Sequence, residues 1–186
     1  MSGYGAYGKM PGMGDFLRMD LSRGFVSVWD AWLQQSLQAS RAALGDRFAP
    51  AYNSAPIWRF TLAPGLAGRD PVFGVMMPSV DRVGRAFPLT LAGRGAGAEQ
   101  AVFEALEEVA LAALEPDATR AHLAATLARV PPSAAPASAS AGATWRAVLA
   151  HGQLDMTTPG LPLALDARRL FDLALWPARA AREVSQ

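Results

Sequence analysis

The stretch Met76–Leu91 reads MMPSVDRVGRAFPLTL and holds the densest pattern of polar residues between two apolar segments in the chain. One apolar run ends at Pro78, and a second begins at Ala86. Between them lies a short polar turn with one acid and two arginines. Two apolar runs joined by such a turn predict a pair of neighbouring strands. The pattern alone leaves the turn open as a site, an interface or a structural connection.

The segments around this stretch predict further strands with short connections. Ile57–Ala63 alternates in part between apolar and polar residues and is closed by a Pro-Gly pair. Val72–Met77 and Ala86–Ala92 are the next two candidate strands, and Pro88 inside the last favours a strand start, an edge or a bulge. Three strands with short turns between them predict an antiparallel meander at the centre of the fold.

A long helix is expected before the meander. Ser22 is a favoured capping residue and predicts a helix that runs to about Leu44, with Gly45 directly after its end. Because the tryptophans fall on the apolar face, we interpret them as core anchors. That face recurs at three- and four-residue spacing and comprises Phe25, Trp29, Trp32, Leu33, Leu37 and Leu44.

Helical patterns return after the meander. Ala98–Leu114 carries one apolar stripe with glutamates beside it, and Asp117 is the expected cap of a second helix that ends near Val130. Thr144–Ala150 fits either a helix or a strand. We expect a short strand at residues 161–165 and a last helix at residues 167–175, capped by Asp166.

The composition limits the class of protein. The chain has 186 residues, of which 51% are hydrophobic and 18% charged, as expected for one globular domain. A net charge of +1 gives no reason to expect a nucleic-acid partner. The absence of cysteine excludes disulfides and thiol catalysis and is compatible with a reducing cytosol. Without a secretory signal or an apolar run of roughly 18 residues, we expect a cytoplasmic protein with no membrane insertion.

Glycines near the N-terminus imitate two phosphate-binding motifs. Gly3, Gly5 and Gly8 spell G-x-G-x-x-G, and Gly3 with Gly8-Lys9 spells most of a P-loop. Both motifs act at the start of a helix that follows a strand. Because two residues precede the first glycine and Pro11 opposes a helix, we interpret the segment as an edge strand and a turn.

The usual catalytic patterns are missing. The sequence has no G-x-S-x-G elbow, no H-x-x-x-H and no E-x-x-H. Its paired acids, Glu107 and Glu108, are expected on a solvated helix face, and His122 is expected at a helix boundary rather than on a metal. We therefore expect no enzymatic activity, no cofactor and no metal.

Two polar turns remain as candidate sites, one near the N-terminus and one inside the opening stretch. An internal network would pair an acid of either turn with Arg82 or Arg85, whereas a recognition surface would present the arginines to a protein partner. The residues alone leave both roles open. The candidates for partner binding or turn bracing are Lys9, Asp15, Arg18, Ser79, Asp81, Arg82 and Arg85.

Several linked strings in the first half of the chain resemble one family. Residues 8–16 (GKMPGMGDF) match a G-K-x-P-x-x-G-D-F opening, residues 55–60 read APIWRF, and residues 78–85 read PSVDRVGR before FPLT. These strings keep their order from about Gly3 to Leu91. In them, the chain resembles the TagF family of type VI secretion accessory proteins. The second half resembles the family weakly, at Thr144-Trp145-Arg146 and at Leu170-Phe171.

The resemblance implies an α/β fold, with a central, largely antiparallel or mixed sheet flanked by helices in three layers. It also implies a non-enzymatic protein that restrains type VI secretion after translation. In some systems this restraint involves a cytoplasmic forkhead-associated scaffold protein and opposes a threonine-phosphorylation pathway. We expect a single compact domain over residues 1–186, with a flexible loop at residues 131–142 and a polar tail at residues 178–186.

Two other functions compete with this expectation. One is a small hydrolase or phosphate-ligand enzyme that uses the glycine-rich N-terminus together with Asp81, Arg82 and Arg85. The other is a structural component of the secretion apparatus. Convergence of the polar side chains in an open pocket would favour the enzyme, and their pairing with each other would count against it.

Overall fold

A computed structural model describes residues 3–134 and 141–177, and within these ranges seven strands form one sheet. The strand order is β2-β1-β5-β4-β3-β6-β7, and every neighbouring pair is antiparallel. The expected meander is confirmed as β3-β4-β5 at the centre of this sheet. The strands are β1 (Tyr4–Gly8), β2 (Leu17–Met19), β3 (Trp58–Leu62), β4 (Val72–Met77), β5 (Leu89–Arg94), β6 (Ala143–Leu149) and β7 (Gly152–Thr158).

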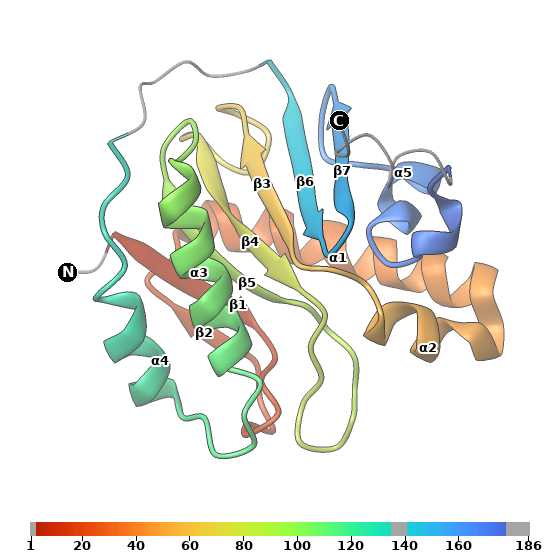
Figure 1. Cartoon of the computed structure of the whole chain (residues 1–186), viewed down its shortest axis with the longest axis horizontal. Coiled ribbons are helices and arrows are strands. Elements are labelled where there is room, and N and C mark those ends of the chain that lie inside the picture. The colour runs from red at the N-terminus through yellow and green to blue at the C-terminus, as the bar shows by residue number, and fades with distance from the viewer. Residues whose placement is uncertain (1–2, 135–140, 178–186) are drawn as a thin grey trace.

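Helices cover both faces of the sheet (Figure 1). The longest, α1, packs with α2 and α5 on one face, and α3 with α4 covers part of the other. The expected sheet with flanking helices is therefore confirmed, in three layers. The helices are α1 (Arg23–Leu44), α2 (Phe48–Asn53), α3 (Gln100–Ala112), α4 (Arg120–Leu127) and α5 (Ala164–Arg169), with short 3-10 turns η1 (Gly45–Arg47) and η2 (Leu173–Leu175).

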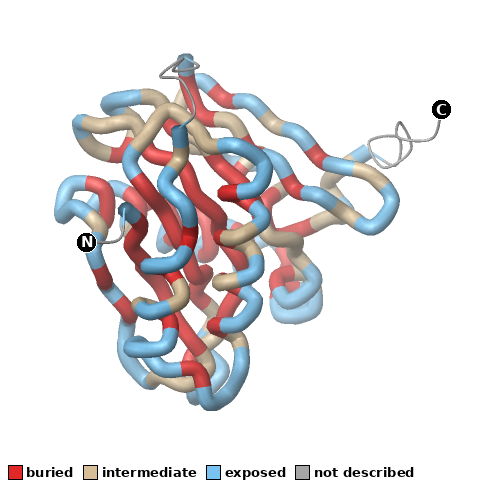
Figure 2. The backbone as a smooth tube through the Cα atoms, turned by 60° about the vertical axis from the view of Figure 1, so that its left-hand side comes forward, coloured by how far each residue is buried: buried red, intermediate tan, exposed pale blue. Residues whose placement is uncertain are grey.

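Each face of the sheet buries its own core, and Figure 2 shows buried residues concentrated along the strands. The core beneath α1 is aromatic. Trp29 is fully buried, with its ring centroid 4.7 Å from that of Phe60 and 6.0 Å from that of Trp145. The core beneath α3 is mainly aliphatic and includes Leu106 and Leu91. A sheet with both faces buried explains why its central strands read as continuous apolar runs.

The first helix begins and ends where its capping residues predict. The Ser22 hydroxyl accepts a hydrogen bond from the Phe25 N–H at 3.1 Å, and Gly45 follows the helix with a φ of 53°. A positive φ is readily adopted by glycine, which has no Cβ to clash with the carbonyl oxygen. The predicted apolar face of α1 is buried in full.

Two predicted element boundaries are wrong, one at the last strand of the meander and one at a helix after it. β5 begins at Leu89 instead of Ala86, because Pro88 has no N–H to give to the ladder, and Ala86 forms only an isolated bridge with Val80. The cap of α4 is Thr119 instead of Asp117. Its hydroxyl accepts the His122 N–H at 3.1 Å, so the helix starts later than expected.

The last third of the chain differs most from the sequence interpretation. The ambiguous run at residues 144–150 is strand β6, and it pairs with β7, which the sequence did not predict. The expected strand at residues 161–165 is wrong, because α5 begins at Ala164. Asp166 lies in the first turn of α5 and does not cap it. Residues 135–140 of the expected loop, and the tail at residues 178–186, lie outside the described residues.

The expected edge strand near the N-terminus is also placed differently. β1 lies inside the sheet between β2 and β5, and the short β2 forms that edge. Gly5 explains part of this placement, since a Cβ there would lie 2.3 Å from the Met19 carbonyl oxygen of β2. The glycines thus allow close packing between strands, which is a structural role.

Candidate functional site

Two loops leave the same end of the sheet and meet there (Figure 1). We call residues 9–16 the N-terminal loop; it follows β1. We call residues 78–88 the signature loop; it connects β4 to β5. Because β1 and β4 are both antiparallel to β5, the ends of β1 and β4 lie beside the start of β5. The topology therefore brings the two polar turns of the sequence together, although about 70 residues separate them.

The carboxylate of Asp81 joins the two loops. Its side chain is fully buried, and its Oδ2 accepts a 2.9 Å hydrogen bond from Lys9 Nζ and a 2.6 Å hydrogen bond from Arg85 Nε. Its Oδ1 accepts the backbone N–H groups of Val83 at 3.1 Å and Arg85 at 2.9 Å. Lys9 is itself buried, with 8% of its side chain exposed. One carboxylate thus fixes the turn and ties it to the N-terminal loop.

These contacts set the charge state of Asp81. Burial alone would raise its pKa, but the hydrogen bonds from Lys9, Arg85 and the Val83 N–H outweigh burial and hold the pKa well below its ordinary value. The carboxylate therefore stays ionised at neutral pH, where all four of its hydrogen bonds are charge-assisted.

The arginines of the signature loop bind the backbone of the N-terminal loop. Arg82 donates through Nη2 to the Gly12 carbonyl at 2.9 Å, and Arg85 donates through Nη2 to the Gly14 carbonyl at 3.1 Å. The Arg82 N–H also donates to the Met13 carbonyl at 3.0 Å. Both guanidinium groups remain on the surface, and 64% of the Arg85 side chain is exposed. They brace the loops and still face solvent.

Ser79 is anchored by a residue that sequence reasoning missed. The Tyr52 hydroxyl donates to the Ser79 carbonyl at 2.9 Å and accepts the Ser79 N–H at 3.0 Å. Burial of Tyr52 raises the pKa of its hydroxyl well above the ordinary value, which keeps it protonated as a donor. The Ser79 side chain is also buried. Tyr52 lies in the short α2, for which the sequence carried no recognised signal.

We expect Tyr52→Phe to lower the free energy of unfolding by about 1–3 kcal/mol, because it leaves the buried Ser79 N–H without its acceptor. Urea denaturation followed by tryptophan fluorescence measures the change. Phe48→Leu, which alters the neighbouring ring but no hydrogen bond to Ser79, is the control. A loss for Tyr52→Phe below about 0.5 kcal/mol would show that the hydroxyl is dispensable.

An aromatic cluster lies beside the ion cluster. The Phe16 ring stacks on Tyr7 with centroids 5.9 Å apart and meets Phe87 edge-on at 4.8 Å. Lys9 Nζ lies 5.1 Å from the Phe16 ring centroid, within the range of a cation–π interaction. Phe16 remains 47% exposed. It therefore supports the loops from within and adds apolar area to the surface that they share.

Two of the candidate residues lie outside this network. Asp15 and Arg18 are exposed, and among the described residues neither side chain forms a hydrogen bond or ion pair with Asp81 or with the signature-loop arginines. Arg18 lies on β2, opposite Tyr7 in the sheet. The set that the structure brings together is therefore Lys9, Asp81, Arg82 and Arg85, with Ser79 at its base.

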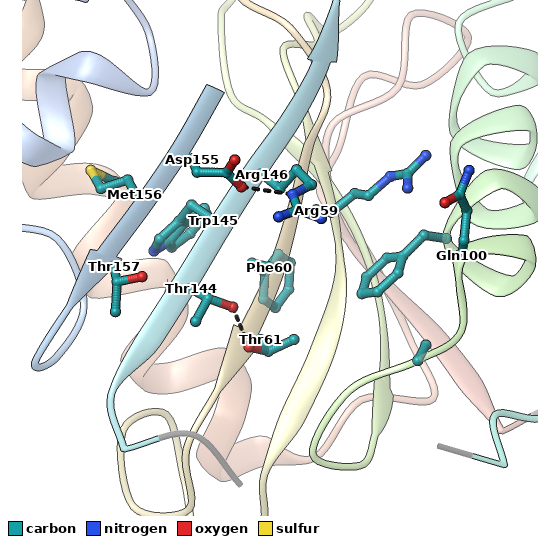
Figure 3. Close-up of a pocket in the computed structure, with 12 residues that line it drawn as sticks. Arg59, Phe60, Thr61, Gln100, Thr144, Trp145, Arg146, Asp155, Met156 and Thr157 are labelled. Atoms are coloured by element: carbon teal, nitrogen blue, oxygen red, sulfur yellow. Dashed lines mark hydrogen bonds and ion pairs between the residues drawn. The ribbon is translucent and has the colours of Figure 1, made fainter. Parts of the chain in front are cut away.

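A separate cavity of about 470 Å³ lies on the sheet face that α3 leaves uncovered (Figure 3). Its charged groups are paired. Arg59 binds Glu107 of α3 through Nε and Nη2 at 2.7 and 2.8 Å, and Arg146 binds Asp155 at 2.6 Å. The expectation of a solvated Glu107 is therefore wrong, because this glutamate holds α3 to β3. The paired charges give the cavity no excess of either sign.

The described residues contain no group of three or more histidine, aspartate or glutamate side chains placed to hold a metal ion. Among the described helices, none combines the length with the hydropathy that crossing a bilayer requires.

Comparison with known proteins identifies the family of the chain. The sequence model of the TagF N-terminal domain, described as type VI secretion system-associated, matches residues 5–130, more than half of the chain. The chain belongs to the TagF family. Both loops of the site fall inside the matched range. The comparison with curated proteins gives no match.

A solved structure extends the likeness beyond the TagF match. The crystal structure of PA0076 from Pseudomonas aeruginosa PAO1 is 32% identical in sequence and superimposes with a TM-score of 0.79. The alignment covers 91% of this chain and 94% of that one. The C-terminal part, which resembles the family weakly in sequence, therefore belongs to a fold that the two proteins share. TagF membership establishes a type VI secretion-associated protein.

Proposed function

We propose that this protein is a non-enzymatic regulator that restrains type VI secretion after translation by binding a cytoplasmic component of the system. The observation that carries the proposal is the TagF N-terminal domain over residues 5–130, which contains both cross-braced loops. These loops form a rigid surface with exposed arginines and apolar side chains. Arginine and aromatic residues on a rigid base are the composition that protein interfaces favour.

The state of the polar residues supports a binding role over catalysis. A catalytic acid needs access to substrate, whereas the Asp81 carboxylate is buried and accepts all of its hydrogen bonds from Lys9, Val83 and Arg85. Its low pKa also makes it a poor proton donor or acceptor at neutral pH. The Asp81 carboxylate is paired with Lys9 and Arg85, and the Arg82 side chain donates to the Gly12 carbonyl. These groups do not converge in an open pocket, which counts against the hydrolase alternative.

The proposed partner is a protein component of the secretion system in the cytoplasm, and the forkhead-associated scaffold protein is the first candidate to test. A regulator that acts by binding needs a preformed surface, because ordering mobile loops would weaken the complex. The buried Lys9–Asp81 pair holds the two loops together before any partner binds.

Deleting the gene in a strain with an active type VI secretion system should increase the amount of secreted effector while leaving transcript levels of the secretion genes unchanged. Restoring the wild-type gene should return secretion to its original level. Immunoblots of culture supernatants and quantitative PCR give the two measurements.

Secretion that stays unchanged after deletion would contradict a restraining role. Stoichiometric co-purification of the protein with assembled apparatus, without a free soluble pool, would favour the structural-component alternative instead.

A further inference from the structure

We propose that the tip of the signature loop, residues 82–84, inserts into an apolar pocket of the partner and that carboxylates border this pocket. The inference rests on the proposed function and adds to it the chemistry of the partner surface. It is carried by three observations: the rigidity of the tip, its exposed valine, and the unused donors of the Arg82 guanidinium and of the adjoining Arg85.

The rigidity of the tip comes from hydrogen bonds that do not involve its exposed side chains. The Gly84 N–H donates to the Asp81 carbonyl at 2.9 Å, and the Asp81 N–H donates to the Arg85 carbonyl at 3.1 Å. The buried carboxylate of Asp81 accepts the N–H groups of Val83 and Arg85 from below. Gly84 has a φ of 82°, which a residue with a side chain rarely adopts. A tip held in this way loses little conformational entropy on binding.

The apolar part of the tip is Val83. Its exposed fraction is 72%, and its backbone N–H is bonded to the buried Asp81 carboxylate. The surrounding contacts therefore fix its position while leaving its side chain in water. Phe16, on the adjoining loop, is 47% exposed. A short branched apolar side chain on a fixed turn fits a small apolar pocket, where its burial would favour binding.

The charged part of this surface consists of guanidinium groups with unused donors, Arg82 within the tip and Arg85 directly after it. A guanidinium has five N–H donors. Within the described contacts, Arg82 uses one on the Gly12 carbonyl, and Arg85 uses two on Asp81 and Gly14. Next to them Arg41 donates to the Ala86 carbonyl at 3.1 Å. The remaining donors suit carboxylates, which guanidinium groups bind in a directional and bidentate way.

The acids near this surface lie outside the tip. Asp81 is buried and neutralised by Lys9 and Arg85. Asp15 lies on the N-terminal loop, and Gly12 of that loop packs against the backbone of residues 116 and 118, so the exposed Glu115 and Asp117 belong to the segment beside that loop. The basic character is therefore confined to the tip and its immediate neighbourhood. Attraction at this range requires partner carboxylates in direct contact rather than a general field.

The test compares restraint of secretion by tip variants in the deletion strain. Val83→Asp and Arg82→Glu each place a carboxylate against the proposed acidic pocket rim, so effector secretion should rise to the level of the deletion strain. Val83→Ile keeps the apolar contact and should retain most of the restraint. Arg82→Lys keeps the charge but loses the bidentate geometry, so it should restrain secretion more than Arg82→Glu and less than the wild type. Melting temperatures and immunoblots of cell lysates establish that all variants fold and accumulate.

Exposed residues elsewhere provide matched controls. Val28 is a 40% exposed valine on α1, and Arg69 is an exposed arginine on the loop between β3 and β4. Val28→Asp introduces the same charge on α1, and Arg69→Glu introduces it before the start of β4, whereas the tip follows the end of β4. Both variants should restrain secretion as the wild type does. With the purified scaffold protein as probe, Arg82→Glu should weaken binding at least about tenfold, as expected for an interface hot spot.

The outcomes separate this inference from the proposed function. If deletion leaves secretion unchanged, the proposed function fails, and the inference fails with it. If deletion raises secretion but stable Val83→Asp and Arg82→Glu variants restrain it fully, the protein is a regulator that binds through another surface. If Val83→Asp abolishes restraint while Arg82→Glu preserves it, the pocket is apolar without the carboxylates and the stated chemistry is wrong.

Discussion

Replacing Asp81 with asparagine should lower the melting temperature by on the order of 10 °C, the largest effect expected from a single polar substitution in this chain. The amide group cannot neutralise Lys9, whose ammonium would stay buried without a counter-charge. The Nδ2 group of asparagine would also present hydrogens to the donors of Lys9 and Arg85. Differential scanning calorimetry at pH 7 measures the shift.

The double variant Lys9→Met/Asp81→Asn tests the reason for this loss. Removing both charges leaves no unpaired ion in the interior, so the double variant should melt higher than Asp81→Asn alone. If the double variant melts lower, by the sum of the two single losses, the buried pair is not the source of the effect. Arg85→Ala should lower the melting temperature far less than Asp81→Asn, since the Arg85 side chain is largely exposed.

The pH dependence of the same variants gives an independent check. The pKa of Asp81 is lower in the folded state than its ordinary value of 3.8, so its contribution to stability is complete above about pH 4. The contribution decreases as the pH falls below that value towards the folded-state pKa. The difference in stability between wild type and Asp81→Asn should therefore be constant from pH 7 to about pH 5 and should narrow under more acidic conditions.

Trp29→Ala should lower the free energy of unfolding by about 3–5 kcal/mol, because it empties the centre of the aromatic core. Trp29 has ring contacts with Phe25, Trp32, Phe60 and Trp145. Its Nε1 also donates to the Thr90 hydroxyl at 2.9 Å, which ties α1 to the start of β5 beside the signature loop. Urea denaturation measured by circular dichroism gives the change.

Two substitutions calibrate that result. Trp29→Phe keeps an aromatic ring and removes the hydrogen bond to Thr90, so its loss should lie well below that of alanine. Val28→Ala, at an exposed position on the same helix, should change stability by less than about 0.5 kcal/mol. If Trp29→Ala lowers the free energy of unfolding by no more than Val28→Ala does, the core repacks around the gap.

The sequence was most informative where one local signal sufficed. The spacing of apolar residues and the Ser22 cap predicted α1 to within a residue, because a helix is stabilised by contacts three and four positions apart. The hairpin of β6 and β7 was harder to predict from the sequence. β7 exposes polar residues such as Gln153 and Asp155 on one face, so its sequence lacks the apolar run that revealed the central strands.

In the candidate site, too, the sequence revealed some residues and missed others. The motif residues Lys9, Asp81 and Arg85 were recognisable from the sequence, but their partners were not. The internal network that the sequence suggested paired Asp15 or Asp81 with an arginine. It did not include Lys9, which is the buried counter-ion of Asp81. Tyr52, which holds Ser79 from another element, carried no motif at all.

By itself, the sequence determined the family, the type of its principal helices and central strands, and the two polar turns that carry the signature. Those features depend on residues near each other in the chain. Only the tertiary structure decided that Asp81 is buried and shared between Lys9 and Arg85 while Arg82 and Val83 face solvent. The physical reason is that burial and pairing are set by antiparallel packing of β1 and β4 against β5, which joins loops about 70 residues apart.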